Sequence, residues 1–198
     1  MNRNDLNPEL RDDTELQSCI AVLELSSIAK GIEVADSVLK ESAVEMLFAT
    51  NVQPGKYVML FTGEVRDVES SAERGAQIAG PDLVDRLVIQ QVHEQIVPML
   101  RRRGGKINGK LDAIGVVETT TVASAVSACD FALKTATVDL IDFRIANGLG
   151  GKSFFVVTGE VSDVRSAVAG GARTAQEKGL LQREVVIPQP HPDLVRHL

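Results

Sequence analysis

Short apolar segments alternate with amphipathic segments along the chain, and this alternation predicts its secondary structure. Residues 20–25 and 113–118 are apolar runs rich in β-branched residues, which are typical of buried strands. After each run, apolar residues recur at spacings of four, three and four, which predicts a helix with one inward face. The expected inward residues are Ile28, Ile32, Ala35 and Leu39 in the first helix, and Val122, Val126, Cys129 and Leu133 in the second.

Each of these helices is followed by two more strands, a second helix and a final strand. The expected strands are 44–50, 57–65 and 87–91 in the first half of the chain, and 138–145, 153–161 and 185–188 in the second. The order strand–helix–strand–strand–helix–strand is that of the split βαβ unit. The pattern therefore predicts an α/β chain built from two α+β, ferredoxin-like units.

The two halves of the chain are copies of one sequence. Residues 20–24 align with 114–118 at an offset of 94, and the segment Thr-Gly-Glu-Val at 62–65 recurs at 158–161 at an offset of 96. His93 and His191 correspond at an offset of 98. Matches in the same order with small insertions indicate a tandem duplication. The predicted divisions are a flexible tail 1–17, a first domain 18–103, a linker 104–110 and a second domain 111–198.

Composition narrows the classes of function. The 198 residues carry a net charge of −6, which argues against a general binder of nucleic acid or of anionic membranes. No apolar run approaches the ~20 residues of a spanning helix, and residues 1–17 are too polar for a signal peptide. Cys19 and Cys129 are too few for a disulfide scaffold and too far apart for a metal motif, so a reducing cytoplasm is expected.

Candidate catalytic residues are sparse, and each has a structural interpretation. His93 and His191 stand at predicted strand-to-helix junctions, where capping or an interface is the favoured role over metal binding. Glu24 and Glu118 are repeat equivalents at strand ends, and paired carboxylates could serve acid–base chemistry or structure. The glycine-rich loop 147–152 offers backbone amides to an anion, or is a tight turn between strands.

Several motifs together resemble the bacterial microcompartment (BMC) shell domain. They include Ile20-Ala21-Val22-Leu23-Glu24-Leu25, the repeated Thr-Gly-Glu-Val-x-Asp-Val, Gly148-Leu149-Gly150-Gly151-Lys152 and Val186-Ile187-Pro188-Gln189-Pro190-His191. The unpermuted tandem order is similar to that of the trimeric, two-domain shell proteins, especially the type found in propanediol-utilisation microcompartments. The resemblance extends from about Cys19 to Leu198.

The resemblance implies a homotrimer that forms a pseudohexameric tile with a central pore. Carried over from the family, the pore-lining positions are Val52, Gln53 and Pro54 in the first copy, and Asn147, Gly148 and Leu149 in the second. The tile-edge positions are Lys40, Lys134, Gln189 and His191. At Gln189 this chain lacks the arginine of the family's edge motif. At Gln53 it lacks the cysteine that binds an iron–sulfur cluster in some relatives, so no cofactor or metal is expected.

The expected function is a non-enzymatic tile of a microcompartment shell in the cytoplasm, with a pore that passes small polar metabolites. Its expected partners are two copies of itself and other shell proteins, without nucleic acid or membrane. Two alternatives come from other classes. A regulatory module of ferredoxin-like repeats would bind a ligand between its domains, and an electron-transfer shell subunit would contain iron.

Overall fold

The computed structural model describes residues 19–102, 111–145, 152–195 and 197; the predicted tail 1–17 and linker 104–110 lie outside the described residues. The elements of the first domain are β1 (Cys19–Leu25), α1 (Ile28–Glu41), β2 (Glu45–Val52), β3 (Lys56–Gly63), α2 (Val65–Ala79), the 3-10 helix η1 (Gly80–Asp82), β4 (Leu83–Ile89) and α3 (Ile96–Arg102). Those of the second domain are β5 (Ala113–Thr119), α4 (Val122–Thr135), β6 (Asp139–Ile145), β7 (Ser153–Gly159), α5 (Val161–Glu177), β8 (Leu181–Pro188) and α6 (Pro192–Val195).

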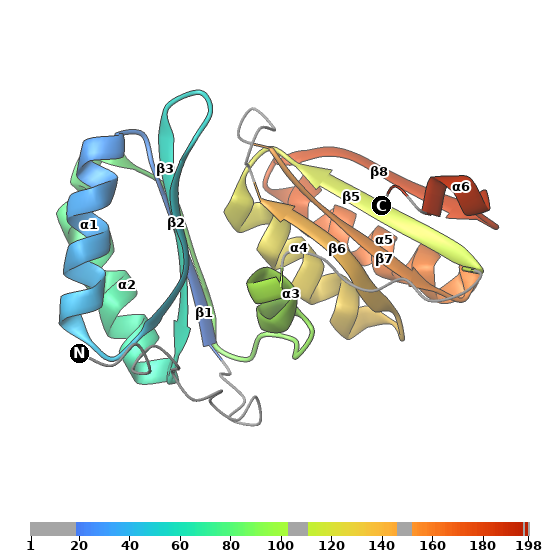
Figure 1. The fold of residues 1–198 in the computed structure, drawn as a ribbon, viewed down its shortest axis with the longest axis horizontal. Helices are drawn as coiled ribbons and strands as arrows, with labels where there is room; N and C mark the ends of the chain where they lie inside the picture. The colour runs from blue at the N-terminus through green and yellow to red at the C-terminus, as the bar shows by residue number, and fades with distance from the viewer. Residues whose placement is uncertain (1–18, 103–110, 146–151, 196, 198) are drawn as a thin grey trace, which may run out of the picture.

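Each domain is a four-stranded sheet with two helices on one face (Figure 1). The strand orders are β2-β3-β1-β4 and β6-β7-β5-β8, with antiparallel pairing in every ladder. The strands of the two copies also pair in the same register. Leu23 faces Met59 in the first copy, and their repeat equivalents Val117 and Phe155 face each other in the second. The predicted ferredoxin-like α+β fold is therefore confirmed in both copies.

The final strand of each domain is longer than the sequence pattern predicted. β4 begins at Leu83 and β8 at Leu181, four residues before the predicted starts at 87 and 185. The added residues include Asp85, Arg86 and Arg183, whose charges hid the strand from a search for apolar runs. They pair with β1 and β5, where one side of an antiparallel sheet can carry polar side chains.

The predicted inward face of α1 is wrong for Ile28, Ile32 and Leu39, and right only for Ala35. The residues that α1 buries are Gly31, Val34, Ala35 and Val38, whereas Ile28, Ile32 and Leu39 are exposed. The helix carries two apolar stripes, and the one that faces its own sheet and α2 contains the smaller side chains. Spacing shows which residues share a face, but it does not show what that face contacts.

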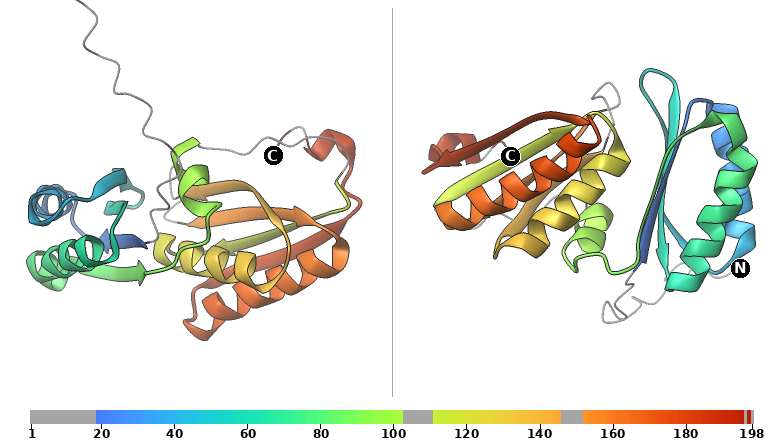
Figure 2. Two further views of the ribbon diagram at one scale, coloured as in Figure 1. Left: turned by 90° about the horizontal axis from the view of Figure 1, so that it is seen from below. Right: turned by 180° about the vertical axis from the view of Figure 1, so that it is seen from behind.

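The equivalent stripe on α4 has a different environment. Val122, Val126, Cys129 and Leu133 are all buried, as predicted. α4 lies between the two domains (Figures 1 and 2), and these residues belong to one apolar cluster with residues of both sheets. A helix that is apolar nearly all round is expected where both sides are covered.

Both α1 and α4 begin with the same local signal. Ser27 caps α1 by accepting a hydrogen bond from the Lys30 amide, and Thr121 caps α4 by accepting one from the Ser124 amide, at 3.3 and 3.2 Å. Both cap residues are extended, as an N-cap requires. Both copies of the duplicated sequence have therefore kept a hydroxyl N-cap at the start of the first helix.

A glycine holds α1 close to its sheet, and the second copy solves the same packing differently. A Cβ atom on Gly31 would lie 2.4 Å from Tyr57 Cβ and Cγ. The equivalent positions of the second copy are Ala125 and Ser153, a larger helix residue facing a smaller strand residue. The two pairs are complementary in volume, so the copies are not interchangeable at this contact.

We expect Gly31→Ala to destabilise the chain by about 1–2 kcal/mol, because the clash with Tyr57 outweighs the better helix propensity of alanine. In a Tyr57→Ser background the same substitution should become neutral or stabilising, since the pair then matches Ala125 and Ser153. Urea unfolding followed by circular dichroism gives both differences. A similar loss in the two backgrounds would show that the clash with Tyr57 is not the cause.

Candidate functional site

The two domains pack on each other through a shared apolar cluster, and we call this contact the domain joint. It comprises the open sheet face of the first domain, α3, and the outer face of α4. Ile20, Val22 and Leu60 come from the sheet and belong to the same apolar cluster as Val122 and Val126. Burial of aliphatic side chains at about 25 cal/mol per Å² makes such a cluster the main source of attraction between the domains.

A buried carboxylate lies at the start of α4. Glu24 is the last residue but one of β1 and is 1% exposed, and its Oε1 accepts a hydrogen bond from the Ala123 amide at 2.9 Å. No acidic residue stands in the first turn of α4, so Glu24 supplies negative charge at the positive end of the helix dipole. Glu24 and Ala123 are 99 positions apart in the sequence. The sequence patterns around the two residues did not predict this contact.

Burial decides the ionisation of Glu24. Desolvation raises the pKa of Glu24 above its ordinary value of 4.5, and the nearby Asp85 acts in the same direction. The Ala123 amide and Lys56, whose Nζ lies 4.0 Å from Oε2, oppose this shift. The carboxylate is thus held by structural contacts, in agreement with the structural interpretation of the pair Glu24 and Glu118.

Polar contacts close the rim of the domain joint. The His93 amide donates to Asp130 Oδ1 at 2.8 Å, and Lys134 Nζ binds both Asp130 Oδ2 and the Gln91 carbonyl oxygen. Gln95 bridges to β6, since its side-chain oxygen accepts from the Leu140 amide at 2.7 Å. Asp130 and Lys134 are therefore partly enclosed between the domains.

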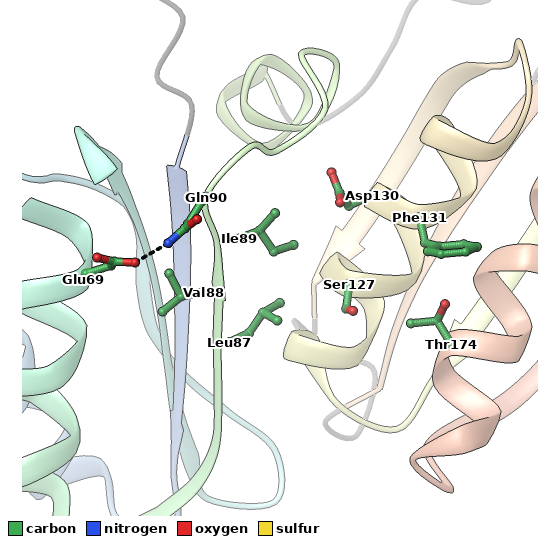
Figure 3. A pocket seen from close by; sticks show the side chains of 9 residues that line it. All are labelled: Glu69, Leu87, Val88, Ile89, Gln90, Ser127, Asp130, Phe131 and Thr174. Carbon is green, nitrogen blue, oxygen red and sulfur yellow. Dashed lines mark hydrogen bonds between the residues drawn. The ribbon is translucent and has the colours of Figure 1, made fainter. Parts of the chain in front are cut away.

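A cavity of about 500 Å³ opens beside this rim (Figure 3). Leu87 and Ile89 of β4 form one wall, and Ser127 and Phe131 of α4 form the other. Its two carboxylates already have partners, because Glu69 accepts from Gln90 and Asp130 binds Lys134. The cavity is a half-apolar groove between the domains.

The predicted pore residues are only partly described. Val52 ends β2 and is buried, while Gln53 and Pro54 are exposed in the β2–β3 turn. That turn extends past the neighbouring end of α1 (Figure 1). Asn147, Gly148 and Leu149 lie outside the described residues. The structure thus brings Gln53 to an exposed tip.

The predicted tile-edge residues occupy two different environments. Lys40 is exposed and pairs with Asp36 at 2.6 Å, whereas Lys134 makes the equivalent pair with Asp130 inside the rim of the domain joint. Gln189 is exposed after β8 with φ of 49°, and its amide donates to the Asp112 carbonyl. His191 is exposed and accepts from the Asp193 amide through Nδ1.

The remaining candidates have structural roles. His93 Nδ1 accepts from the Gln95 amide, so both histidines cap the turns that follow the final strands, as predicted. Burial raises the pKa of the Cys19 thiol to about 11 and raises that of Cys129 as well. Both thiols are packed and protonated at neutral pH. Within the described ranges, no cluster of three or more acidic, histidine or cysteine side chains could hold a metal ion.

Comparison with known proteins identifies the two repeats. The family model of the BMC domain matches residues 19–92 and 113–190. The chain belongs to the BMC domain family. Each match coincides with one four-stranded unit, so the BMC domain is the duplicated unit.

Several relatives align with the chain across both BMC domains. The chain is 39% identical over 183 residues to the bacterial microcompartment shell protein PduT of Citrobacter freundii. The aligned residues cover 92% of this chain and 98% of the relative. It is 27% identical to the carboxysome assembly protein CcmO of Synechocystis, of which it covers only 63%. A solved microcompartment protein from Desulfitobacterium hafniense DCB superposes with a TM-score of 0.83 at 41% identity, covering 91% of this chain and 99% of that one.

A single-domain relative matches one half of the chain. The shell protein PduA of Citrobacter freundii is 35% identical over 88 residues, which is 44% of this chain and 91% of the relative. By its two BMC domains and these similarities, the chain is a structural shell protein of a bacterial microcompartment. The comparisons lend no support to a ligand-binding regulatory module or an electron-transfer subunit. Among the described helices, none is long and apolar enough to cross a membrane.

The burial of Glu24 predicts how the stability of the chain changes with pH. Because the pKa of Glu24 is raised in the folded state, its stabilising contribution is complete below the unfolded value of 4.5 and is lost as pH rises through the folded pKa. The free energy of unfolding of the wild type, measured relative to Glu24→Gln, should therefore increase as the pH is lowered from 7 toward 4.5.

Glu24→Gln keeps an oxygen that accepts from the Ala123 amide, so at pH 7 it should be at least as stable as the wild type. Glu24→Ala should lose about 1–3 kcal/mol, because the amide at the buried helix end is left without an acceptor. Urea unfolding across this pH range at fixed protein concentration measures all three. A difference between wild type and Glu24→Gln that does not change with pH would contradict the buried, desolvated carboxylate.

Proposed function

We propose that three chains close into a ring of six BMC domains, and that this ring is a pseudohexagonal tile of the shell. The observation that carries the proposal is the unpartnered stripe on α1. Ile28, Ile32 and Leu39 are 40%, 58% and 49% exposed, whereas their repeat equivalents Val122, Val126 and Leu133 are buried in the domain joint.

The surface that would cover this stripe is present at the other end of the chain. Val185 of β8 is exposed, and its repeat equivalent Leu87 packs in the domain joint. Leu194 is likewise exposed, while its equivalent Ile96 is fully buried there. The open sheet face of the second domain therefore has the chemistry needed to pack on α1 of another chain, as the first sheet packs on α4.

A contact of this kind joins two different surfaces, head to tail. Repeating a heterologous contact generates a closed ring when the rotation between neighbours divides a full turn. A chain that already contains one such contact between equivalent domains needs three copies to make a ring of six. The tandem architecture supports this count, since it places two equivalent domains in each chain.

The centre and the rim of the ring follow from the same arrangement. We place the exposed turn with Gln53 at the axis, together with Asn147–Leu149, where it filters small polar metabolites by size and hydrogen bonding. We place Lys40 at the rim, where its long stem lies along a neighbouring tile and its ammonium group finds carbonyl or carboxylate oxygens. The partners are other shell proteins, and the tile carries out no catalysis.

The protein should have a mass in solution of about three times 21.3 kDa. Ile32→Glu should convert it into a folded monomer, because the joint between chains would bury an unpaired charge at a cost of several kcal/mol. Native mass spectrometry measures the mass, and circular dichroism checks that the monomer is folded.

Val84→Glu is the matched control for Ile32→Glu. Val84 is 44% exposed, but its repeat equivalent is the polar Gln182, so it has no counterpart in the domain joint. This variant should remain trimeric. A monomeric wild type, or two variants that dissociate equally, would argue against the ring.

Purified under anaerobic conditions, the protein should be colourless and contain no stoichiometric iron. Iron–sulfur clusters need thiolate ligands, and the neutral amide of Gln53 is a poor substitute. Cys19 and Cys129 are buried in the two domain cores and cannot replace it. Iron analysis and the visible spectrum test this, with Gln53→Cys reconstituted with iron and sulfide as the positive comparison. One cluster per trimer in the wild type would refute it.

A further inference from the structure

Glu118 and the start of α1 are the repeat equivalents of the two sides of the Glu24 contact, and within the described residues neither makes that contact. Glu24 is 1% exposed beneath α4, whereas the Glu118 side chain is 35% exposed. Ala29 is the equivalent of Ala123. In the described part of the chain, the Ala29 amide has no acceptor corresponding to Glu24.

The two helices need the same kind of partner. Neither α1 nor α4 has an acidic residue in its first turn, although each begins at a hydroxyl N-cap. In α4 the missing negative charge comes from Glu24 of another domain. In the part of the chain that the structure describes, no side chain accepts from the Ala29 amide at the start of α1, beside the exposed stripe that contains Ile28 and Ile32.

We propose that Glu118 caps α1 of the next chain, with its carboxylate accepting from the Ala29 amide as Glu24 accepts from Ala123. The proposal rests on the ring of three chains described above, and it names a residue that fastens one chain to the next. The second copy of this chain is the occupant, because the equivalent contact within one chain already displays the bound geometry at 2.9 Å.

The surroundings of Glu118 differ in charge from those of Glu24. Glu24 faces Asp85 across the β1–β4 ladder and has Lys56 nearby, whereas Glu118 faces Arg183 across the β5–β8 ladder. Lys152 Nζ lies 3.2 Å from Glu118 Oε1. Two basic residues, Lys152 and Arg183, are therefore neighbours of Glu118 at the proposed contact between chains.

Removing the carboxylate tests the proposal. Glu118→Ala should raise the dissociation constant of each joint between chains by about 10- to 100-fold, as expected for the loss of a charge-assisted hydrogen bond. Glu118→Gln keeps a neutral acceptor and should fall between the alanine variant and the wild type. Sedimentation velocity over a nanomolar to micromolar dilution series measures the populations of trimer and monomer.

Glu184→Ala is the matched control. Glu184 is an exposed acid on β8, and its repeat equivalent Arg86 contacts Glu73 on α2 rather than the domain joint. This variant should dissociate like the wild type. Hydrogen exchange supplies a second readout that needs no variant: amides of the first turn of α1 should exchange more slowly in the trimer than in the diluted monomer.

The outcomes separate this proposal from the ring itself. A wild type that is monomeric throughout the series would overturn both. A trimeric wild type whose Glu118→Ala variant dissociates no more readily, with α1 amides equally exchangeable in trimer and monomer, would overturn the role of Glu118 and leave the ring standing. Selective dissociation of the Glu118 variants, with Glu184→Ala unchanged, supports the proposal.

Discussion

The packing of a sheet from one domain against a helix from the next is the contact on which the rest of the molecule depends. Each BMC domain covers one face of its sheet with its own helices and leaves the other face open. The open face of the first domain needs an apolar partner, and α4 provides one. Because the covering helix comes from a different domain, one domain alone leaves both a sheet face and a helix face exposed. The packing of the first sheet on α4 is therefore a requirement of the fold of this chain.

Much of the fold could be predicted from the sequence because the duplication shows the residue pattern of each element twice. Strands 20–25 and 113–118 are apolar in both copies, and the order of elements followed from them. The first four residues of β4 and of β8 were missed, since charged residues such as Asp85 and Arg183 interrupt the apolar pattern. Three of the four residues predicted to face inward on α1 are exposed, because α1 has two apolar stripes and periodicity does not show which partner covers which stripe.

The candidate site was less predictable, for a physical reason. The contact between Glu24 and the Ala123 amide joins a side chain to a backbone group. Every residue type except proline has a backbone amide, so the identity of residue 123 does not reveal the contact. The equivalence of Glu24 and Glu118 was visible, and it indicated that the position mattered without indicating its partner. The roles of Gln53 and Lys40 stay predictions, since they concern contacts with other chains.

The joint inside one chain has a property that no contact between chains shares: its two halves can never diffuse apart. Its strength is expressed as the stability of a single chain, whereas the same contact between separate molecules is expressed as a dissociation constant. The ratio of the two is an effective concentration set by the connection between the domains. In the proposed ring, Glu24 and Glu118 allow one interaction to be measured in both forms. Half of the joints in that proposed ring lie within a chain and are independent of dilution, and cellular concentration controls only the other half.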